Sequence, residues 1–364
     1  MLSPKTKRNL TRIIPFGLIW LVFSLAYSLL EKGLLGDLRF YPSTGNPYNF
    51  NKTLIVTAVI AVLLGLVIGA IEISYLSKLF VQKSFSKKIL LKTFIYLLII
   101  ISFLLIVTSV YNSVELVEGI FSKQVLRNTW IFFTDFAFWS VLSYIAAVIG
   151  VTLFYTEVSE YLGQGVLHNF LTGKYHRPQE EERIFMFLDM KSSTTIAEQI
   201  GHVRYFEMIK EYYFDLSDSI IKYSGEIYQY VGDEVVVSWK LEDGLLNNNC
   251  VKCFFDMKLA IQKQIPKYNE QFGLVPAFKA ALHLGKVTTG EIGVIKKDII
   301  FTGDVLNTTA RIQGLCNSYG VDILISDPLI QRLHLHSQFQ IQALGENELR
   351  GRGEKIKLYT LLPD

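Results

Sequence analysis

The chain has 364 residues, of which 50% are hydrophobic and only 19% are charged. Soluble domains carry about 25% charged residues, so this composition argues against a wholly soluble or disordered chain. The formal net charge of +3 is small and spread along the sequence, which argues against a nucleic acid partner. The three cysteines are too few, and odd in number, for a disulfide framework, and all lie in the second half, which predicts a reducing compartment for that half.

The first part of the chain contains four apolar stretches that are long enough to span a bilayer. Each has at least 18 residues, which corresponds to about 27 Å or more as a helix. We therefore predict an all-α four-helix transmembrane domain over residues 1–155, with spans at residues 13–30, 53–76, 93–110 and 130–155. The first stretch lacks a small-residue cleavage site, which favours a span over a signal peptide.

Basic residues predict the orientation of these spans. The N-terminal tail holds four lysines and arginines, and the loop between the second and third spans holds five, whereas the other two loops hold three and two. Cytoplasmic loops are enriched in such residues. We expect a multi-pass protein of the cell (inner) membrane whose N-terminus and long C-terminal half are cytoplasmic.

Glu72 and Asp135 are ionisable residues inside the predicted spans, where charge is costly. Each is a candidate functional residue, or else a protonated or hydrogen-bonded group that holds the bundle together. The outer loops, of about twenty residues each, are too short for a folded domain. This favours the lipid bilayer itself, a small hydrophobic ligand or a membrane protein as the source of a signal.

A helical linker is predicted between the membrane part and the rest of the chain. Residues 156–175 place apolar side chains at helical spacing, as a continuation of the last span. Pro178 and the glutamates that follow end this pattern, so we expect a linker over residues 156–182 and a domain boundary just before Arg183. The linker either pairs with its copy in a dimer or connects the two parts passively.

The apolar run that begins at Arg183 predicts a buried strand that ends at the carboxylate of Asp189. A helix begins directly after it, and its start carries Lys191, Ser192, Ser193 and Thr194. Unpaired backbone N–H groups at a helix start bind phosphate, and a carboxylate at a strand end binds a hard cation. The alternative is an ordinary Ser/Thr cap after a strand.

A β-hairpin is predicted over residues 225–240, with Gly232 and Asp233 as its two-residue turn. An Asp at a turn is usually structural, but two carboxylates such as Asp189 and Asp233 on adjacent strands form a site for one or two magnesium ions. Residues 278–293 predict a further strand pair and residues 298–302 a short strand. On the helix that follows, Asn307 and Arg311 are four residues apart and share one face.

Four phrases, FLDMKSST, YVGDEVV, ALHLGKVTTGEIG and GDVLNTTAR, occur in this order. Together they resemble the catalytic domain of class III nucleotidyl cyclases over residues 183–361. The resemblance implies an α+β fold, with a ferredoxin-like cyclase catalytic domain at residues 183–364 that follows the transmembrane domain. It also implies a head-to-tail homodimer with two composite active sites.

The resemblance assigns roles to individual residues. Asp189 and Asp233 match the carboxylates that hold two Mg²⁺ or Mn²⁺ ions per active site, with the Met190 carbonyl as a further ligand. Asn307 and Arg311 match the pair that the partner chain contributes, which orients the ribose and stabilises charge on the α-phosphate. Lys279, and Arg350 or Arg352, resemble the places where the family puts cations on the outgoing phosphates.

The base-reading positions depart from the family pattern. In the family that this chain resembles, the best-known adenylate cyclases carry Lys at the first of these positions and Asp or Thr at the second, and guanylate cyclases tend to carry Glu and Cys. This chain has Gln229 and Ile300. Gln has both a donor and an acceptor, so it suits adenine and can also serve guanine, while Ile300 offers no hydrogen bond.

We predict an adenylate cyclase that makes cyclic AMP from ATP. The alternatives are the same chemistry on GTP, a catalytically silent cyclase-like receptor, and a channel or carrier to which the cyclase is attached. Cys250 and Cys253 form a CxxC in a helical stretch without a second pair, and we interpret them as packed thiols rather than zinc ligands.

Overall fold

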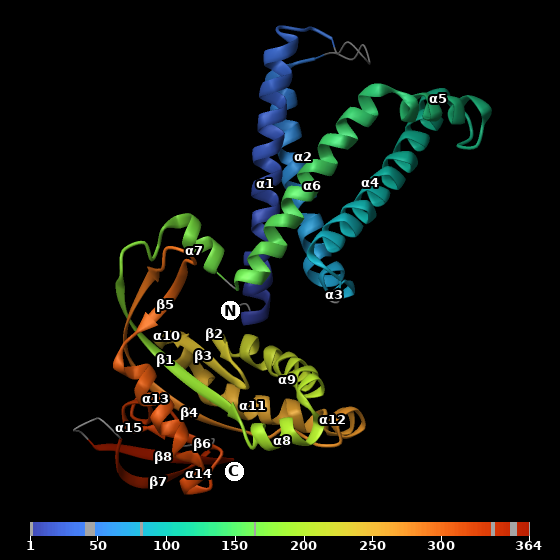
Figure 1. Ribbon diagram of the computed structural model, residues 1–364. Coiled ribbons are helices and arrows are strands. Elements are labelled where there is room, and N and C mark those ends of the chain that lie inside the picture. Colours follow the sequence, from blue (N-terminus) through green and yellow to red (C-terminus); the bar gives the residue numbers. More distant parts are fainter. Residues whose placement is uncertain are drawn as a thin grey trace. The chain divides into compact units, whose positions relative to one another are not determined.

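The computed structural model describes residues 3–40, 48–80, 83–163, 165–335, 339–349 and 355–363. The chain divides into two compact units, one formed by Thr6–Leu162 and the other mainly by Gly163–Asp364. In the described residues the first unit contains helices and no extended sheet, and the second contains an eight-stranded sheet covered by helices (Figure 1).

Four helices of the first unit are long and apolar enough to cross a membrane, as the sequence predicted. The elements of this unit are α1 (Pro4–Leu35), α2 (Phe50–Ile71), the π-helical turn η1 (Glu72–Leu76), α3 (Ser77–Leu79), α4 (Phe85–Leu116), α5 (Lys123–Thr134) and α6 (Phe136–Leu162). The candidate spans are Pro4–Leu35, Phe50–Leu79, Phe85–Val114 and Phe136–Leu162.

The fourth predicted span starts too early, because the helix is interrupted at Asp135. This residue has an extended backbone (φ −68°, ψ 138°) between α5 and α6. Its Oδ1 accepts a hydrogen bond from the backbone N–H of Ala137 at 2.7 Å, which is how an Asp caps a helix start. Asp135 is therefore an exposed cap at the start of α6 rather than a charge inside a span.

Glu72, by contrast, is buried inside the helical unit. Its Oε1 accepts from Lys92 of α4 at 2.6 Å and its Oε2 accepts from the Tyr96 hydroxyl at 3.0 Å. Lys92 also donates to Glu157 of α6 at 2.8 Å. The side chains of Glu72, Lys92 and Glu157 are at most 2% exposed. This geometry agrees with the alternative in which Glu72 holds neighbouring helices together.

The linker is not one continuous helix. Helix α6 ends at Leu162 and a separate short helix, α7, covers Val166–Thr172. Between them Gly163 and Gly165 have positive φ angles of 95° and 73°, a conformation that right-handed helices exclude and that glycine adopts readily. The apolar spacing of residues 156–175 could not reveal this break.

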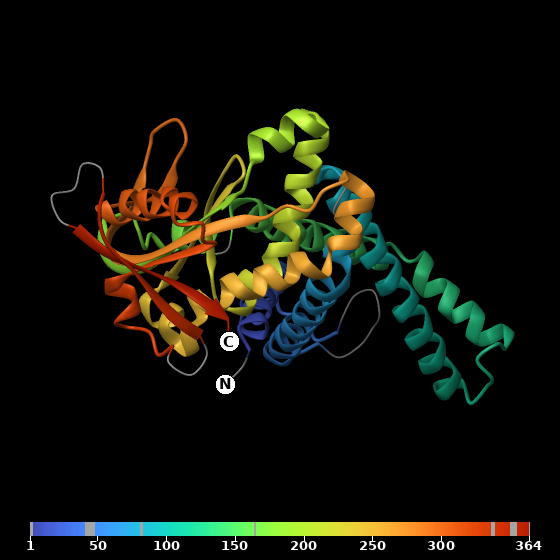
Figure 2. The same cartoon turned by 90° about the horizontal axis from the view of Figure 1, so that it is seen from below.

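The sheet unit has the ferredoxin-like order of strands and helices, β-α-β-β-α-β, in its first part. Its strands are β1 (Gln179–Met190), β2 (Glu226–Val231), β3 (Glu234–Lys240), β4 (Phe278–Ile292), β5 (Asp298–Thr302), β6 (Ile323–Ser326), β7 (Phe339–Glu348) and β8 (Lys355–Pro363). The order across the sheet is β2-β3-β1-β4-β6-β8-β7, and β5 pairs with β4. Figure 2 shows β7 and β8, in red, as a pair at one edge.

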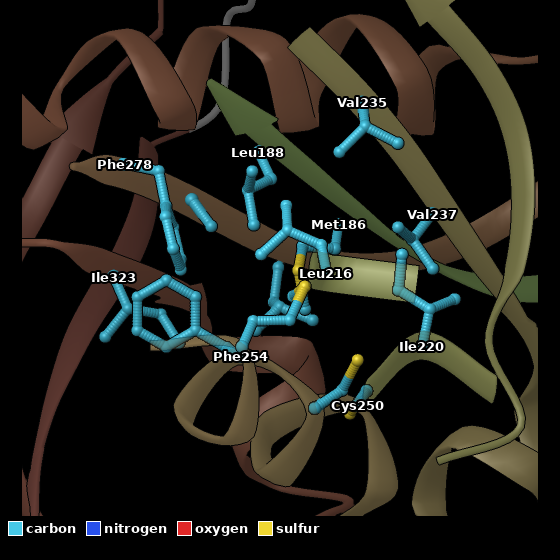
Figure 3. Close-up of a cluster of buried hydrophobic side chains, with 14 of the residues drawn as sticks. Met186, Leu188, Leu216, Ile220, Val235, Val237, Cys250, Phe254, Phe278 and Ile323 are labelled. Atoms are coloured by element: carbon cyan, nitrogen blue, oxygen red, sulfur yellow. The ribbon is translucent and has the colours of Figure 1, made fainter. Parts of the chain in front are cut away.

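Helices cover both faces of this sheet. They are α8 (Ser193–Ile200), α9 (His202–Lys222), α10 (Leu241–Leu245), the 3₁₀ turn η2 (Leu246–Asn248), α11 (Asn249–Lys263), α12 (Ile265–Phe272), α13 (Asp304–Gly314), α14 (Cys316–Tyr319) and α15 (Asp327–Ile330). In the main core, Met186 and Leu188 of β1 pack with Leu216 of α9 and Phe254 of α11 (Figure 3). Helix α13 packs on the opposite face through Val305, beside Phe185 and Phe187 of β1.

Two strand predictions need correction, and one is confirmed. Strand β1 begins at Gln179 rather than Arg183, because Gln179 pairs with Thr289 in an antiparallel ladder with β4. Residues 278–292 form one 15-residue strand, not a strand pair. A Cβ at Gly285 would lie 3.0 Å from Val305 Cβ, so glycine at this position allows α13 to approach β4. The short strand at Asp298–Thr302 is confirmed.

The cysteine prediction agrees with the structure. Cys250 and Cys253 lie in α11 within the main core and are free and fully buried, and so is Cys316.

Candidate active site

Asp189 lies near the end of β1, on the face of the sheet that α13 covers. Side chains of a strand alternate between its two faces. Met186 and Leu188 belong to the core beneath α9 and α11, whereas Phe185 and Phe187 belong to the cluster with Val305 of α13. The same alternation directs Asp189 towards α13.

Two side chains contact the Asp189 carboxylate. The Gln313 amide of α13 donates from Nε2 to Asp189 Oδ2 at 3.1 Å. Lys279 lies directly opposite Asp189 on β4, and its Nζ is 3.5 Å from the same oxygen. Lys279 also donates to Asn317 Oδ1 at 3.3 Å. Lys279 is only 9% exposed, so its ammonium is engaged with the Asp189 carboxylate.

Asp233 lies at the tip of the predicted hairpin. Val231 pairs with Glu234, which leaves Gly232 and Asp233 as a two-residue turn, and Gly232 has a φ of 65°. The Tyr213 hydroxyl of α9 is 2.9 Å from the Gly232 carbonyl and 3.1 Å from the Glu234 carbonyl, so it can donate to either. Asp233 Oδ2 is buried and has no hydrogen-bond partner among the described residues.

The electrostatics of these carboxylates suit a cation. Burial raises the pKa of Asp189, and the negative charge of Asp233 acts in the same direction, while the Gln313 hydrogen bond and Lys279 oppose it. Burial also raises the pKa of Glu234 to about 6, with the charges of Asp189 and Asp233 adding to the effect. Crowded, partly buried carboxylates of this kind gain from a positive ion placed between them.

The donor set fits Mg²⁺ or Mn²⁺ bound together with a substrate. In the described part of the chain, no cluster of three or more His, Cys, Asp or Glu side chains is arranged to hold a metal ion. Magnesium is usually bound by one or two protein carboxylates plus substrate phosphates and water. Asp189 and Asp233, with the unpartnered Oδ2 of Asp233, match that mode of binding.

The chain turns from β1 into α8 at the predicted phosphate-binding segment. Met190 is buried and pairs with Phe278, and the Lys191 N–H donates to the Ala277 carbonyl at 2.8 Å. Ser192 has a positive φ of 56°. Helix α8 begins at Ser193 and its first helical hydrogen bond comes from the N–H of Ile196.

The N–H groups of Ser193 and Thr194 therefore precede the hydrogen-bonded part of α8 and are of the kind that binds anions. The Lys191 side chain does not join them. Its ammonium forms an ion pair with Asp322, which also accepts from Lys258.

Asn307 and Arg311 lie on α13 but point away from Asp189. Asn307 is exposed and Arg311 is partly exposed. Within the residues that the structure describes, neither side chain makes a hydrogen bond or an ion pair. Arg311 and Gln313 are two residues apart and so differ by about 200° around the helix axis. Because Gln313 contacts Asp189, Arg311 faces the opposite way.

The two positions predicted to read the base lie on strands that contact one another. Gln229 is an exposed residue of β2, next to an irregularity in its pairing with β3, and Ile300 is a partly buried residue of β5. The rings of their neighbours Tyr228 and Phe301 contact one another in a tilted arrangement, with 4.8 Å between centroids, and the Phe301 N–H donates to the Tyr228 hydroxyl at 3.2 Å. These two side chains thus connect β2 with β5, although the two strands do not pair in the sheet.

Two of the predicted site residues lie outside the residues that the structure describes, and two contacts at the site were not indicated by the sequence. Arg350 and Arg352 lie outside the described residues. Gln313 and Tyr213 received no role from the sequence, because their contacts join positions far apart in the chain. Only the place of Gln313, on the helix that carries Asn307 and Arg311, offered a signal.

Comparison with known proteins identifies the family of the sheet unit. Residues 176–363 match the family described as "Adenylate and Guanylate cyclase catalytic domain". This match covers half of the chain, which therefore belongs to that family.

Among relatives, "Adenylate cyclase 2" of Rhizobium meliloti (strain 1021) is 37% identical over 222 residues, which are 61% of each chain. "Adenylate cyclase" of Anabaena cylindrica is 23% identical over 186 residues, 48% of this chain and 36% of the relative. The chain thus spans less than two thirds of the length of either relative. A bacterial light-regulated adenylyl cyclase structure superimposes with a TM-score of 0.52 at 20% identity, over 63% of this chain and 65% of the other. This likeness supports the fold.

Proposed function

We propose that this protein is a membrane-bound adenylate cyclase that converts ATP to 3′,5′-cyclic AMP and pyrophosphate as a homodimer. The observation that carries the proposal is the pairing of β1 with β3, in which Leu188 lies opposite Val235, so that Asp189 lies beside the turn that holds Asp233. Asp233 Oδ2 is buried and unpartnered in the described residues. The 37% identity to a protein named as an adenylate cyclase supports ATP as the substrate.

Asp189, Asp233 and the Met190 carbonyl would hold Mg²⁺ or Mn²⁺, two ions per active site. When bound, the ions supply Lewis acidity, which lowers the pKa of the ribose 3′-hydroxyl and offsets charge on the phosphates. The N–H groups of Ser193 and Thr194, after Ser192, hold the phosphate oxygens at the start of α8. Lys279 and Gln313 keep the Asp189 carboxylate in place.

A second copy of the chain completes the site. Since Arg311 and Asn307 face away from the Asp189 of their own chain, they are free to reach the site of a partner. The ribose 3′-oxygen bonds to the α-phosphorus, the bond from that phosphorus to the bridging oxygen breaks, and pyrophosphate leaves while the 3′ proton passes to solvent. Arg311 stabilises the charge that grows on the α-phosphate, and Asn307 orients the ribose.

Gln229 is the residue that reads the base in this proposal. Its amide can accept from the adenine amino group and donate to the adjacent ring nitrogen. The same amide can also pair with guanine, and Ile300 adds no hydrogen bond that would reject it. GTP is therefore the second candidate substrate.

The four apolar helices support anchoring in the cell membrane. The excess of lysine and arginine among residues 5–12 and 78–92, compared with the segments at the other ends of the helices, favours a cytoplasmic catalytic unit. The signal received by the helices would then be a lipid, a small hydrophobic ligand or another membrane protein.

The test is product formation by the purified full-length protein in lipid nanodiscs, with ATP or GTP in separate reactions and with Mg²⁺ or Mn²⁺. Cyclic AMP from the wild type, and none from Asp189→Asn or Arg311→Ala, is the expected result. Arg332→Ala serves as the control, because Arg332 is an exposed arginine of the same unit. Cyclic GMP alone would overturn the choice of base, and no cyclic product from a folded dimer would favour the silent receptor.

Co-expression of the two inactive variants tests the composite site. In a mixed dimer, one site carries both defects and the other carries neither. Random pairing of Asp189→Asn with Arg311→Ala should therefore restore about one quarter of the wild-type activity. No restoration, despite mixed dimers detected by differential tags, would contradict the contribution of Arg311 from the partner.

A further inference from the structure

Gln313 is a buried polar side chain that touches the proposed metal site without being one of its ligands. It is 8% exposed, and its Nε2 donates to Asp189 Oδ2 at 3.1 Å across 124 positions of sequence. A buried amide on a sheet-facing helix position is costly unless it is hydrogen-bonded. The contact with Asp189 is thus a reason for a glutamine at this position.

The contact leaves one carboxylate oxygen for another ligand. Gln313 Nε2 and Lys279 Nζ both approach Oδ2 of Asp189, at 3.1 and 3.5 Å. Among the described residues no donor is bonded to Oδ1. A carboxylate held through one oxygen has a restricted side-chain torsion, so its second oxygen has a defined direction.

The chemistry of the amide also suits this place. Glutamine donates a hydrogen bond without adding charge, whereas a glutamate would add a further carboxylate beside Asp189 and Asp233. A second lysine beside Lys279 would compete with a bound cation by repulsion. A neutral donor therefore orients Asp189 and leaves its negative charge available.

The backbone that carries Gln313 is firmly held. Val305, Thr308, Thr309 and Ile312 of α13 are all at most 4% exposed, and Val305 packs beside the close approach at Gly285. The same short helix carries Arg311 on its opposite side, so Gln313 and Arg311 are held by one backbone segment.

We propose that Gln313 is a positioning residue that orients Asp189 for divalent cation binding. The inference rests on the proposed function, since Asp189 is the proposed metal ligand. Residues that hydrogen-bond to a metal ligand typically contribute about 10- to 100-fold to metal affinity. Removal of the Gln313 donor should weaken cation binding by that factor, with turnover restored by excess cation.

The experiment measures Mn²⁺ binding to the full-length protein in nanodiscs by electron paramagnetic resonance of the free ion, with a non-cyclisable ATP analogue present. Gln313→Met removes the donor at similar length, and Gln313→Asn keeps an amide that is one methylene too short to reach Asp189. Both should raise the Kd for Mn²⁺ about 10- to 100-fold. The kcat at saturating Mn²⁺ should stay within about threefold of wild type, because the transition-state groups are intact.

Gln331→Met is the matched control, because the Gln331 amide also bonds to an aspartate, Asp327, but at an exposed site. Its Mn²⁺ affinity should equal that of wild type. An unchanged Kd in both Gln313 variants, an equal loss in Gln331→Met, or a kcat that excess Mn²⁺ does not restore would each overturn the assignment. If the wild type itself neither binds Mn²⁺ nor forms a cyclic product, the proposed function fails instead.

Discussion

The ion pairs inside the helical unit allow a quantitative test of how that unit is held together. Lys92 lies between two carboxylates, at 2.6 Å from Glu72 and 2.8 Å from Glu157. Lys88 is a second cation, at 3.2 Å from Glu157. With two lysines and two glutamates, the four side chains are formally neutral as a group.

Lys92→Met keeps the length and volume of the side chain but leaves two buried carboxylates with one cation. Breaking a buried ion pair by removing one partner costs about 3–5 kcal/mol, because the other charge is left uncompensated. Glu72→Gln should cost less, about 1–3 kcal/mol, because Lys92 keeps Glu157 and Tyr96 can still donate to the amide oxygen. Lys92→Met should therefore destabilise the helical unit more than Glu72→Gln, because Lys92 contacts two carboxylates.

The double variant Glu72→Gln/Lys92→Met gives the sharpest result. It retains the pair between Lys88 and Glu157, so no buried charge is left alone. We expect it to be more stable than Lys92→Met by about 1–3 kcal/mol, a coupling that neighbouring residues commonly show.

The assay is equilibrium unfolding of the full-length protein in mixed dodecylmaltoside and SDS micelles. Trp20 is a buried residue of the helical core and reports on that unit once the other three tryptophans are replaced by phenylalanine in every variant. Lys87→Met is the control, because Lys87 is an exposed lysine of the same helix. The reasoning that these charges are buried and paired would be refuted if each single variant lost less than about 1 kcal/mol of unfolding free energy and the double variant lost the sum of the two.

Three further outcomes are expected. Because Cys250 is buried and its pKa is raised to about 12, it and the other two thiols should resist N-ethylmaleimide at pH 8 until the protein unfolds; rapid labelling of the native protein, read by mass spectrometry, would contradict this. Tyr213→Phe removes a hydroxyl that bonds to the turn carrying Asp233, so Mn²⁺ affinity measured by electron paramagnetic resonance should fall up to about fivefold, the equivalent of a hydrogen bond of ~1 kcal/mol; an unchanged affinity would show that the turn holds without it. Gly285→Ala places a Cβ 3.0 Å from Val305, so the free energy of unfolding of the catalytic unit, measured by thermal denaturation, should fall by about 1–3 kcal/mol. Gly320→Ala is the comparison, because Gly320 has a left-handed backbone but no atom near its Cβ position, so it reports the cost of backbone strain without crowding.

Much of the fold followed from local patterns. Four apolar stretches of spanning length predicted the four long helices, because the thickness of a bilayer sets their length. The Gly232 and Asp233 turn predicted the β2–β3 hairpin, and the phrase around Asp189 predicted a strand that ends at a carboxylate. Such features depend on a few neighbouring residues and are therefore readable from the chain alone.

The two incorrect helix predictions, for the last span and for the linker, also have local causes. The last span was extended through Asp135, although an aspartate can cap a helix start and so divide an apolar stretch in two. The linker was extended through Gly163 and Gly165, whose positive φ angles stop a helix. In both places hydrophobic spacing outweighed the conformational preference of a single residue.

Short motifs in the sequence predicted the family, which the comparisons confirm, and also the proposed site residues Asp189, Asp233, Asn307 and Arg311. The contacts between side chains, by contrast, were visible only in the folded chain. Folding brought Gln313 to Asp189 across 124 positions and turned Arg311 of the same helix the other way. It also paired Glu72 with Lys92 inside the helical unit. Contacts of this kind depend on which faces of a sheet and a helix are packed together, and no local pattern encodes that choice.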